Sequence, residues 1–359
     1  MFYNIKLFLK QFFYAIIFWI CSCTLFLLIR FLAYGEDQSG ENEIAQNIVP
    51  ITEWLHYGLI VGILIGFFYA IIEFLFDKLL SKRIYLGITI ILKFILYILV
   101  LIFSLTFILS IIEQDMDINL PNGRGWWVEN SIFWLAALYF FISSFIFLFI
   151  RLADEKFGKG ILFKMLIGKY RNPKEEERIF MFLDLKSSTT IAEEIGHYKY
   201  SRLIQDCFLD LNKVVNRYNG EIYQYVGDEA VITWPYKRGL KNNNCVALYF
   251  AFNKALKKRS KYYSRRYNLN PFFKAGLHGG KLIIAEVGVI KKDLAFHGDV
   301  INTTSRIQEE CNTYNEALLI SEELLNQLKL KSRYNSAEIG NLELKGKQEQ
   351  LKVYSINET

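Results

Sequence analysis

The chain has 359 residues, of which 52% are hydrophobic, and 42 basic against 36 acidic residues give it a formal net charge of +6. This charge is modest, and no concentrated basic stripe with interleaved aromatic residues stands out, so we expect no nucleic-acid partner. The five cysteines lack metal-ligand spacing, which argues against a cysteine-ligated metal site and predicts free thiols.

Four long apolar stretches dominate the first part of the chain, at roughly 11–34, 54–76, 84–112 and 131–150. Each has at least the roughly 20 residues that a helix needs to cross a bilayer. A cleaved signal peptide is the alternative for the first stretch, but that stretch is too long and no clear A-x-A site follows it. We therefore predict an α-helical membrane domain with four transmembrane helices over residues 1–152, in contact with a lipid bilayer.

The charges of the connecting segments predict the orientation of these helices. Two of the loops are acidic, "GEDQSGENE" and "IEQDMD". The other flanks are basic, and they contain Lys6, Lys10, Lys78, Lys82, Arg83, Lys156, Lys159 and Lys164. Since basic loops remain in the cytoplasm, we expect both termini and the second half of the chain to lie there, beneath the cell membrane.

Ionisable residues within the apolar stretches are the next feature. Glu73 and Lys93 both fall towards the inner third of neighbouring spans. Charges at such depth are costly, so the two side chains either pair with each other or snorkel to the interface. Neither alternative identifies the ligand or partner protein of the membrane domain.

Residues 153–178 predict a short membrane-proximal linker that transmits signals between two domains. This segment is charged and is interrupted by glycines and by Pro173, so it does not fit one long coiled coil.

From residue 179 to 359 the sequence alternates between strand and helix patterns. "RIFMFLDL" predicts a buried strand, and the residues from Ser188 to Asn219 predict a helix that Gly220 ends. "EIYQYV" and "AVITW" predict a hairpin, followed by a helix around 243–259 and by two strands, "PFFKAGLHGG" and "KLIIAEVGVI". A helix starting near Asp299 and a terminal strand–turn–strand complete the pattern. The order β-α-β-β-α-β predicts a ferredoxin-like α/β sandwich whose first and second strands both lie inside the sheet.

Two aspartates stand at positions suited to metal-assisted phosphate chemistry. Asp184 ends the first strand in "FLDLKSSTT", where the backbone of Ser187, Ser188 and Thr189 can present N–H groups to phosphates. Asp228 lies on the turn of "QYVGDEAVITW". Alone, either aspartate would more often be structural, and Asp228 could simply belong to a surface hairpin. Together they suit a pair of Mg²⁺ or Mn²⁺ ions, whereas we expect Glu229 to be solvated.

Five motifs carry a resemblance to a known family. "FLDLKSST", "YVGDEAVITW", "FKAGLHGGKLIIAEVG", "HGDVINTTSRI" and "LKGKQEQLKVYSI" resemble the motifs of class III nucleotide cyclase domains, in order and spacing, over about 179–356. The resemblance implies that Asp184 and Asp228 bind two metal ions, Mg²⁺ or Mn²⁺, with a backbone carbonyl from Leu185. It also implies that Asn302 orients the ribose and that Arg306 stabilises charge on the α-phosphate.

The resemblance further implies the reaction and the assembly. The ribose 3′-hydroxyl would attack the α-phosphate and expel pyrophosphate. Lys345 or Lys347, with Lys345 preferred, would hold the terminal phosphates, and a solvated lysine is the alternative for this terminal hairpin. The family divides its metal aspartates and its Asn/Arg pair between two subunits, so a head-to-tail homodimer with composite active sites is expected.

Base selection is where this chain departs from the family pattern. The two positions that recognise the purine are Gln224 and Ala295, and neither fits the adenine or the guanine combination. We prefer adenylate cyclase activity on ATP, because adenylate cyclases are the more frequent members of this family. Guanylate cyclase activity on GTP, or a catalytically silent nucleotide-binding sensor, are the alternatives. His278 and His297 are expected to pack or form hydrogen bonds, because cyclisation in this family needs no histidine.

Overall fold

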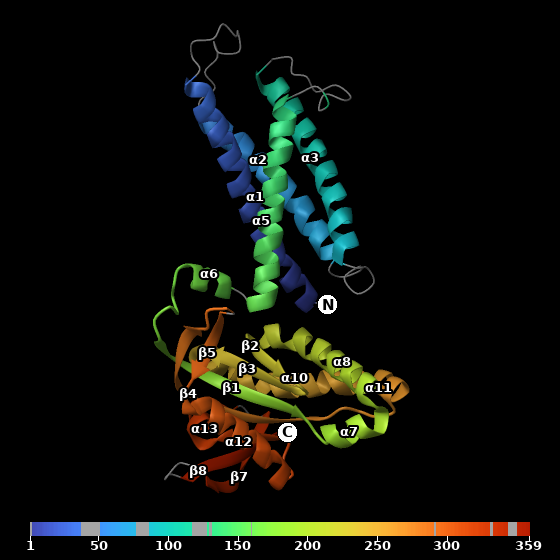
Figure 1. Ribbon diagram of the computed structural model, residues 1–359, viewed down its shortest axis with the longest axis vertical. Helices are drawn as coiled ribbons and strands as arrows, with labels where there is room; N and C mark the ends of the chain where they lie inside the picture. The colour runs from blue at the N-terminus through green and yellow to red at the C-terminus, as the bar shows by residue number, and fades with distance from the viewer. Residues whose placement is uncertain are drawn as a thin grey trace. The chain divides into compact units, whose positions relative to one another are not determined.

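The computed structural model describes residues 2–36, 51–76, 86–116, 128, 131–158, 160–290, 292–330, 333–343 and 350–359. Lys345 and Lys347, residues 37–50 of the first acidic loop and the basic loop with Lys78, Lys82 and Arg83 lie outside these residues, whereas "IEQDMD", expected as a loop, is helical as far as Met116. The chain divides into two compact units, Met1–Ala153 and Asp154–Thr359 (Figure 1).

The first unit consists of long apolar helices. Within the described residues, four helices are long and apolar enough to cross a membrane, which confirms the prediction of four membrane helices. They are α1 (Phe2–Glu36), α2 (Ile51–Leu75), α3 (Leu86–Met116) and α5 (Ser131–Phe157). Their shared core is aromatic, and Trp19 packs against Tyr69 and Phe140 with ring centroids 4.3 Å and 5.7 Å away.

Helices α1 and α2 approach closely at two glycines. A Cβ atom on Gly62 would lie 2.5 Å from Cα of Ile20, and one on Gly66 would lie 2.7 Å from Cα of Ile16. Because contacts below 3 Å are not tolerated between such atoms, only glycine allows the two backbones to pack at this distance.

A charged cluster joins three of the membrane helices. Glu73 on α2 is only 5% exposed, and its Oε2 lies 2.7 Å from Nζ of Lys93 on α3. Arg151 on α5 forms an ion pair with the same carboxylate, and the Tyr97 hydroxyl donates a hydrogen bond to it. Of the two alternatives for Glu73 and Lys93, the structure therefore shows pairing. Arg151 was missed because it follows the last apolar stretch in the sequence.

The linker is short and interrupted. Between α5 and residue 174 the described residues include one helix, the six-residue α6 (Ile161–Leu166), which is preceded by Gly158 and Gly160 with φ of 93° and 68°. Tyr170 is buried beside Phe180 and Phe182 of the second unit, and its carbonyl accepts a hydrogen bond from the Glu286 N–H at 2.9 Å. The end of the linker is therefore part of the second unit's core.

Eight strands of the described chain form one sheet in the second unit, in the order β2-β3-β1-β4-β6-β8-β7, with β5 paired to β4. Only β4 and β6 run parallel among these pairs. The strands are β1 (Lys174–Leu185), β2 (Glu221–Val226), β3 (Glu229–Pro235), β4 (Phe273–Val287), β5 (Asp293–His297), β6 (Leu318–Ser321), β7 (Tyr334–Glu343) and β8 (Gln350–Glu358).

The helices of this unit cover both faces of the sheet. One face is covered by α7 (Ser188–Ile195), α8 (His197–Val215), α10 (Asn244–Lys258) and α11 (Ser260–Tyr267), whereas α12 (Asp299–Thr313) packs on the other (Figure 1). Short helices α9 (Tyr236–Leu240) and α13 (Glu322–Gln327) and two 3₁₀ turns, Asn216–Tyr218 and Lys241–Asn243, complete the unit. The order β1-α8-β2-β3-α10-β4 confirms the ferredoxin-like α/β prediction.

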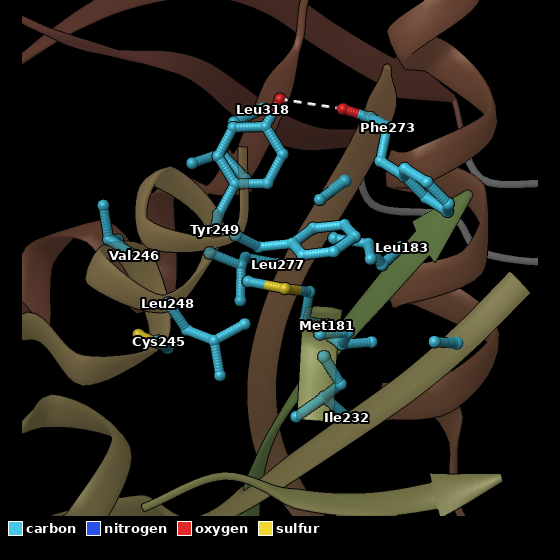
Figure 2. Close-up of a cluster of buried hydrophobic side chains, with 14 of the residues drawn as sticks. Met181, Leu183, Ile232, Cys245, Val246, Leu248, Tyr249, Phe273, Leu277 and Leu318 are labelled. Carbon is cyan, nitrogen blue, oxygen red and sulfur yellow. Dashed lines mark hydrogen bonds between the residues drawn. The ribbon is translucent and has the colours of Figure 1, made fainter. Parts of the chain in front are cut away.

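The main core lies between the sheet and α8 and α10. Met181 and Leu183 of β1 and Leu277 of β4 pack against Leu248 and Tyr249 of α10 (Figure 2). The buried Tyr249 hydroxyl donates a hydrogen bond to the Phe273 carbonyl at 3.0 Å, so burial of this polar group is compensated.

Three sequence-based expectations about elements were wrong. The helix expected from Ser188 to Asn219 is two helices, because Gly196 adopts a φ of 78° between them. The two strands expected within 271–290 are one continuous strand, β4. The second strand, β2, is at the edge of the sheet rather than inside it, and β3 pairs with β1.

Candidate active site

The two predicted metal ligands converge at one end of the sheet. Asp184 is the penultimate residue of β1, and Asp228 lies in the turn between β2 and β3. Leu183 pairs with Ala230 across β1 and β3, which places the turn beside the end of β1. The two carboxyl groups lie close together. Burial, followed by the charge of Asp228, raises the pKa of Asp184 to about 6.

The site contains more negative charge than its own protein groups neutralise. The Oδ2 atom of Asp228 is buried without a hydrogen-bond partner among the described residues. Burial and the charges of Asp184, Asp228 and Glu309 raise the pKa of Glu229 to about 7. Glu229 is half-buried rather than solvated, so that expectation was wrong: the turn that carries Asp228 folds back against β1.

This arrangement fits divalent cations. A buried, unpartnered carboxylate oxygen beside a second carboxyl is a favourable ligand for a hard cation. Within the described residues, no three His, Cys, Asp or Glu side chains form a complete metal site. The two aspartates would therefore need further oxygen ligands, such as phosphate, water or the carbonyl of Leu185. The Leu185 N–H donates a hydrogen bond to Asp184, which partly lowers its pKa.

The predicted phosphate-binding residues, Ser187 to Thr189, come shortly after the end of β1. Ser187 adopts the left-handed conformation with a φ of 58°, and α7 begins at Ser188 without a side-chain cap. Ser187 and Thr189 are exposed and Ser188 is half-buried. The first N–H groups of α7 thus have no intrahelical acceptor. They lie at the end of the sheet that carries Asp184 and Asp228.

Tyr200 connects this loop to the carboxylates, and sequence reasoning missed it. Its phenol lies beside Asp228 and Ser188, and burial together with the Asp228 charge raises its pKa to about 12. In the sequence it is one of two tyrosines in "GHYKYSRL", and no signal there distinguishes it from a solvated helix residue.

Helix α12 contributes a second missed residue. Nε2 of Gln308 donates a hydrogen bond to Oδ2 of Asp184 at 3.4 Å. The helix is held against the sheet at Gly276, where a Cβ would lie 2.5 Å from the Gln308 nitrogen. Gln308 is therefore fixed over the site by backbone packing.

The structure does not bring Asn302 and Arg306 to the carboxylates of their own chain. At 100° per residue, Arg306 lies about 200° around α12 from Gln308, and Asn302 about 120°. Because Gln308 faces Asp184, the other two side chains project elsewhere, and Asn302 is exposed. They are one helical turn apart and share a face, as the sequence predicted.

The two base-selecting candidates lie on different strands, β2 and β5. Gln224 is exposed on β2 opposite Val231, after a register shift, and Ala295 pairs with Ala285 on β5. Their neighbours Tyr223 and Phe296 meet with ring centroids 4.5 Å apart. Because side chains alternate along a strand, Ala295 projects to the face opposite Phe296.

The histidines lie apart from the carboxylates. His278 is 5% exposed, and its Nδ1 is 2.8 Å from the Ser321 hydroxyl, which confirms the predicted hydrogen-bonding role. His297 is exposed at the end of β5.

Comparison with known proteins identifies the class. Residues 171–358 match the family described as the Adenylate and Guanylate cyclase catalytic domain, and the chain belongs to this family. In the sequence, its class III cyclase domain follows four apolar helices.

Among individual proteins, the chain is 35% identical over 219 residues to Adenylate cyclase 2 of Rhizobium meliloti (strain 1021). The aligned region covers 61% of this chain and 60% of that relative, so the chain spans less than two thirds of its length. A bacterial light-regulated adenylyl cyclase has a similar fold, with a TM-score of 0.52, 17% identity, and 64% and 66% of the two chains covered. The adenylyl cyclase CyaB from P. aeruginosa matches with a TM-score of 0.46 at 19% identity, covering 52% and 97%.

Proposed function

We propose that the protein is a membrane-anchored adenylate cyclase that converts ATP to 3′,5′-cyclic AMP and pyrophosphate. The observation that carries this proposal is the pair of carboxyl groups, Asp184 and Asp228, at the end of β1. Their mutual repulsion and the unpartnered Oδ2 of Asp228 suit a site for Mg²⁺ or Mn²⁺ and a triphosphate.

Each residue then has a role in binding or in charge stabilisation. Asp184, Asp228 and the Leu185 carbonyl would hold two ions, and Ser187, Ser188 and Thr189 would cradle phosphate oxygens through backbone N–H groups. When bound, Mg²⁺ or Mn²⁺ supplies positive charge that neutralises the phosphates and lowers the pKa of the ribose 3′-hydroxyl. Lys345 is proposed to bind the terminal phosphates.

Asn302 and Arg306 complete the reaction centre. Asn302 holds the ribose so that its 3′-oxygen faces the α-phosphorus. A new O–P bond forms as the bond to pyrophosphate breaks, and the hydroxyl proton passes to solvent water. The planar fork of the Arg306 guanidinium matches the α-phosphoryl oxygens, where negative charge increases during this step.

The roles proposed for Asn302 and Arg306 require a homodimer. Asn302 and Arg306 face away from the carboxylates of their own chain, so a second copy supplies them. Two chains arranged head to tail would form two composite sites.

ATP is the preferred substrate because a relative at 35% identity is named an adenylate cyclase. Gln224 would read the purine edge, since its amide both donates and accepts hydrogen bonds. GTP is the alternative substrate, because Gln224 and Ala295 fit neither family combination. A catalytically silent sensor is disfavoured, because Asp184, Asp228, Asn302 and Arg306 are all present.

The test is to incubate membranes containing the full-length protein with ATP or GTP and Mn²⁺, and to measure both cyclic nucleotides. Cyclic AMP formation that is lost in Asp184→Ala supports the proposal. Equal product from wild type and Asp184→Ala would contradict it, and cyclic GMP alone would identify the guanylate cyclase alternative.

We also propose that the termini and the cyclase domain are cytoplasmic and that the membrane domain regulates activity. The basic flanks of the helices support this orientation, and the Glu73 cluster supports a link between α5 and the other spans. Labelling of single cysteines introduced at Gly40 and at the exposed Asn357 in intact cells would test the orientation. Labelling at Asn357 by an impermeant reagent would contradict it.

A further inference from the structure

One segment of the cyclase domain is strongly basic. Between Ala230 and Ala285 the chain contains twelve lysines and arginines and no acidic residue. Seven of the twelve fall within residues 254–266, at the end of α10 and in α11. Tyrosines alternate with them, so the expectation that the chain lacks a basic segment with interleaved aromatic residues is wrong for this part of the sequence.

The tyrosines of this segment are directed into the domain. Tyr263 and Tyr267 are buried, and their hydroxyls donate hydrogen bonds to Asp210 at 2.7 Å and to Asp206 at 2.6 Å. Arg259, at the junction of α10 and α11, forms an ion pair with the same Asp210 at 2.6 Å. These contacts hold α11 against α8 and thereby determine the orientation of α11 relative to α10.

The other basic side chains face solvent. Lys254, Lys257 and Lys258 of α10 and Lys261 of α11 are exposed, and the three on α10 follow the i, i+3, i+4 spacing of one helix face. None of these four forms an ion pair with a carboxylate in the described part of the chain. Together with the exposed Arg265 and Arg266 they form a continuous segment of charge, here called the α10–α11 basic surface.

A hollow of about 450 Å³ lies at the α11 end of this surface. Lys199, Arg265 and Arg266 line it, and Glu194 is the one acidic residue among its lining residues. Three cations around a hollow of this size suit a phosphate group.

We propose that the α10–α11 basic surface binds the anionic phospholipid headgroups of the bilayer that anchors the protein, with one headgroup phosphate in the hollow. The membrane helices keep this domain at high effective concentration near the bilayer, and clusters of lysine and arginine are attracted to anionic leaflets. The buried tyrosines are not free to stack on bases, which disfavours single-stranded nucleic acid. The surface lies on the face of the sheet that α8 and α10 cover, opposite the face that α12 covers.

The experiment uses the full-length protein in nanodiscs of phosphatidylcholine alone or mixed with phosphatidylglycerol. Backbone hydrogen–deuterium exchange of residues 254–267 is compared between the two lipids at low and high salt. Three proteins are compared: the wild type, the triple variant Lys254→Gln/Lys257→Gln/Lys258→Gln, and the control Lys281→Gln/Lys292→Gln/Lys329→Gln. The control removes three exposed lysines outside the basic surface, so it matches the change in net charge.

We expect anionic discs to slow exchange in residues 254–267 several-fold in the wild type and the control, at low salt only. The triple variant keeps Lys199, Arg265 and Arg266 of the hollow, so it should show a smaller difference between the two lipids than the wild type and the control, while unfolding at the wild-type temperature. Equal exchange in both lipids for the wild type would overturn the proposal. So would slowing by duplex or single-stranded DNA, added to phosphatidylcholine discs, in the absence of any effect of anionic lipid.

Discussion

At the scale of single residues, the site is organised by carboxyl groups that repel one another. The pKa of Asp184 is raised from 3.8 to about 6, and that of Glu229 from 4.5 to about 7. The folded chain therefore binds more protons than the unfolded chain between about pH 4 and 7. The stability that comes from these protonated groups is full below their unfolded pKa values and is lost as pH rises through the folded ones.

Asp184→Asn should therefore stabilise the metal-free protein at pH 8, because it removes one of the repelling charges. We expect a gain of about 1 kcal/mol, after allowing for solvent screening of a partly exposed carboxyl, and little change at pH 4. Thermal unfolding of the full-length protein in detergent with a chelator measures this, with the exposed Asp293→Asn as control. A lower unfolding temperature for Asp184→Asn at pH 8 would contradict the repulsion argument, whatever the variant's activity.

Tyr200→Phe should weaken metal and substrate binding without unfolding the domain. The change removes a hydroxyl that lies beside Asp228 and Ser188, and a polar contact of this kind contributes about 1 kcal/mol, or about fivefold in apparent affinity. The Mn²⁺ dependence of cyclic AMP formation measures the effect. Tyr198→Phe is the matched control, because Tyr198 is 70% exposed. If cyclic AMP formation depended on Mn²⁺ concentration in the same way in Tyr200→Phe and Tyr198→Phe, a role of Tyr200 in metal and substrate binding would be excluded.

The two aspartates could be predicted from the sequence because Asp184 ends a buried strand directly before a helix, Asp228 lies on the next hairpin turn, and both stand in motifs that resemble the cyclase family. Tyr200 and Gln308 could not, since a polar residue on an amphipathic helix has the same pattern whether it faces solvent or a site. Gln308 is oriented by the contact of α12 with Gly276, and this contact depends on tertiary packing.

At the scale of elements, the glycines of α2 determine how closely it packs on α1. Gly62→Ala would place a methyl group 2.5 Å from Cα of Ile20, so the helices must separate. We expect a loss of about 1–3 kcal/mol, as is typical of overpacking. Gly87→Ala on α3 is the control, because a Cβ there has no atom within 4 Å.

The heat-induced loss of helical signal in detergent measures both variants. Gly62→Ala should unfold at a lower temperature than the wild type, and Gly87→Ala at the same temperature or higher, because alanine favours the helix. Similar effects of the two substitutions would show that close packing at Gly62 is unimportant.

Most elements of the cyclase domain could be predicted because their hydrophobic periods are clear. The break at Gly196 was missed because the apolar spacing continues across it, and only the φ of 78° reveals two helices. The edge position of β2 depends on which strands pair, and short apolar runs do not encode pairing.

At the scale of the whole molecule, the proposed site requires two chains. Asp184→Ala and Arg306→Ala should each abolish cyclic AMP formation, whereas co-expression in equal amounts should restore about a quarter of wild-type activity. The reason is that half of the dimers are mixed and each mixed dimer has one intact site of two.

Co-expression of Asp184→Ala with Asp228→Ala is the matched control for this complementation. Both changes affect the same half of each composite site, so no dimer has an intact site and no activity should return. Recovery in this control, or none in the first pair, would contradict the composite site.

The orientation of α12 has a kinetic consequence. If Asn302 and Arg306 serve the neighbouring chain, product formation requires an encounter between two chains diffusing in the same membrane. At low surface density the rate of cyclic AMP formation would then rise with the square of protein density, and it would become linear once every chain is paired. Crowding of the bilayer, and not only the supply of ATP, would therefore control the signal.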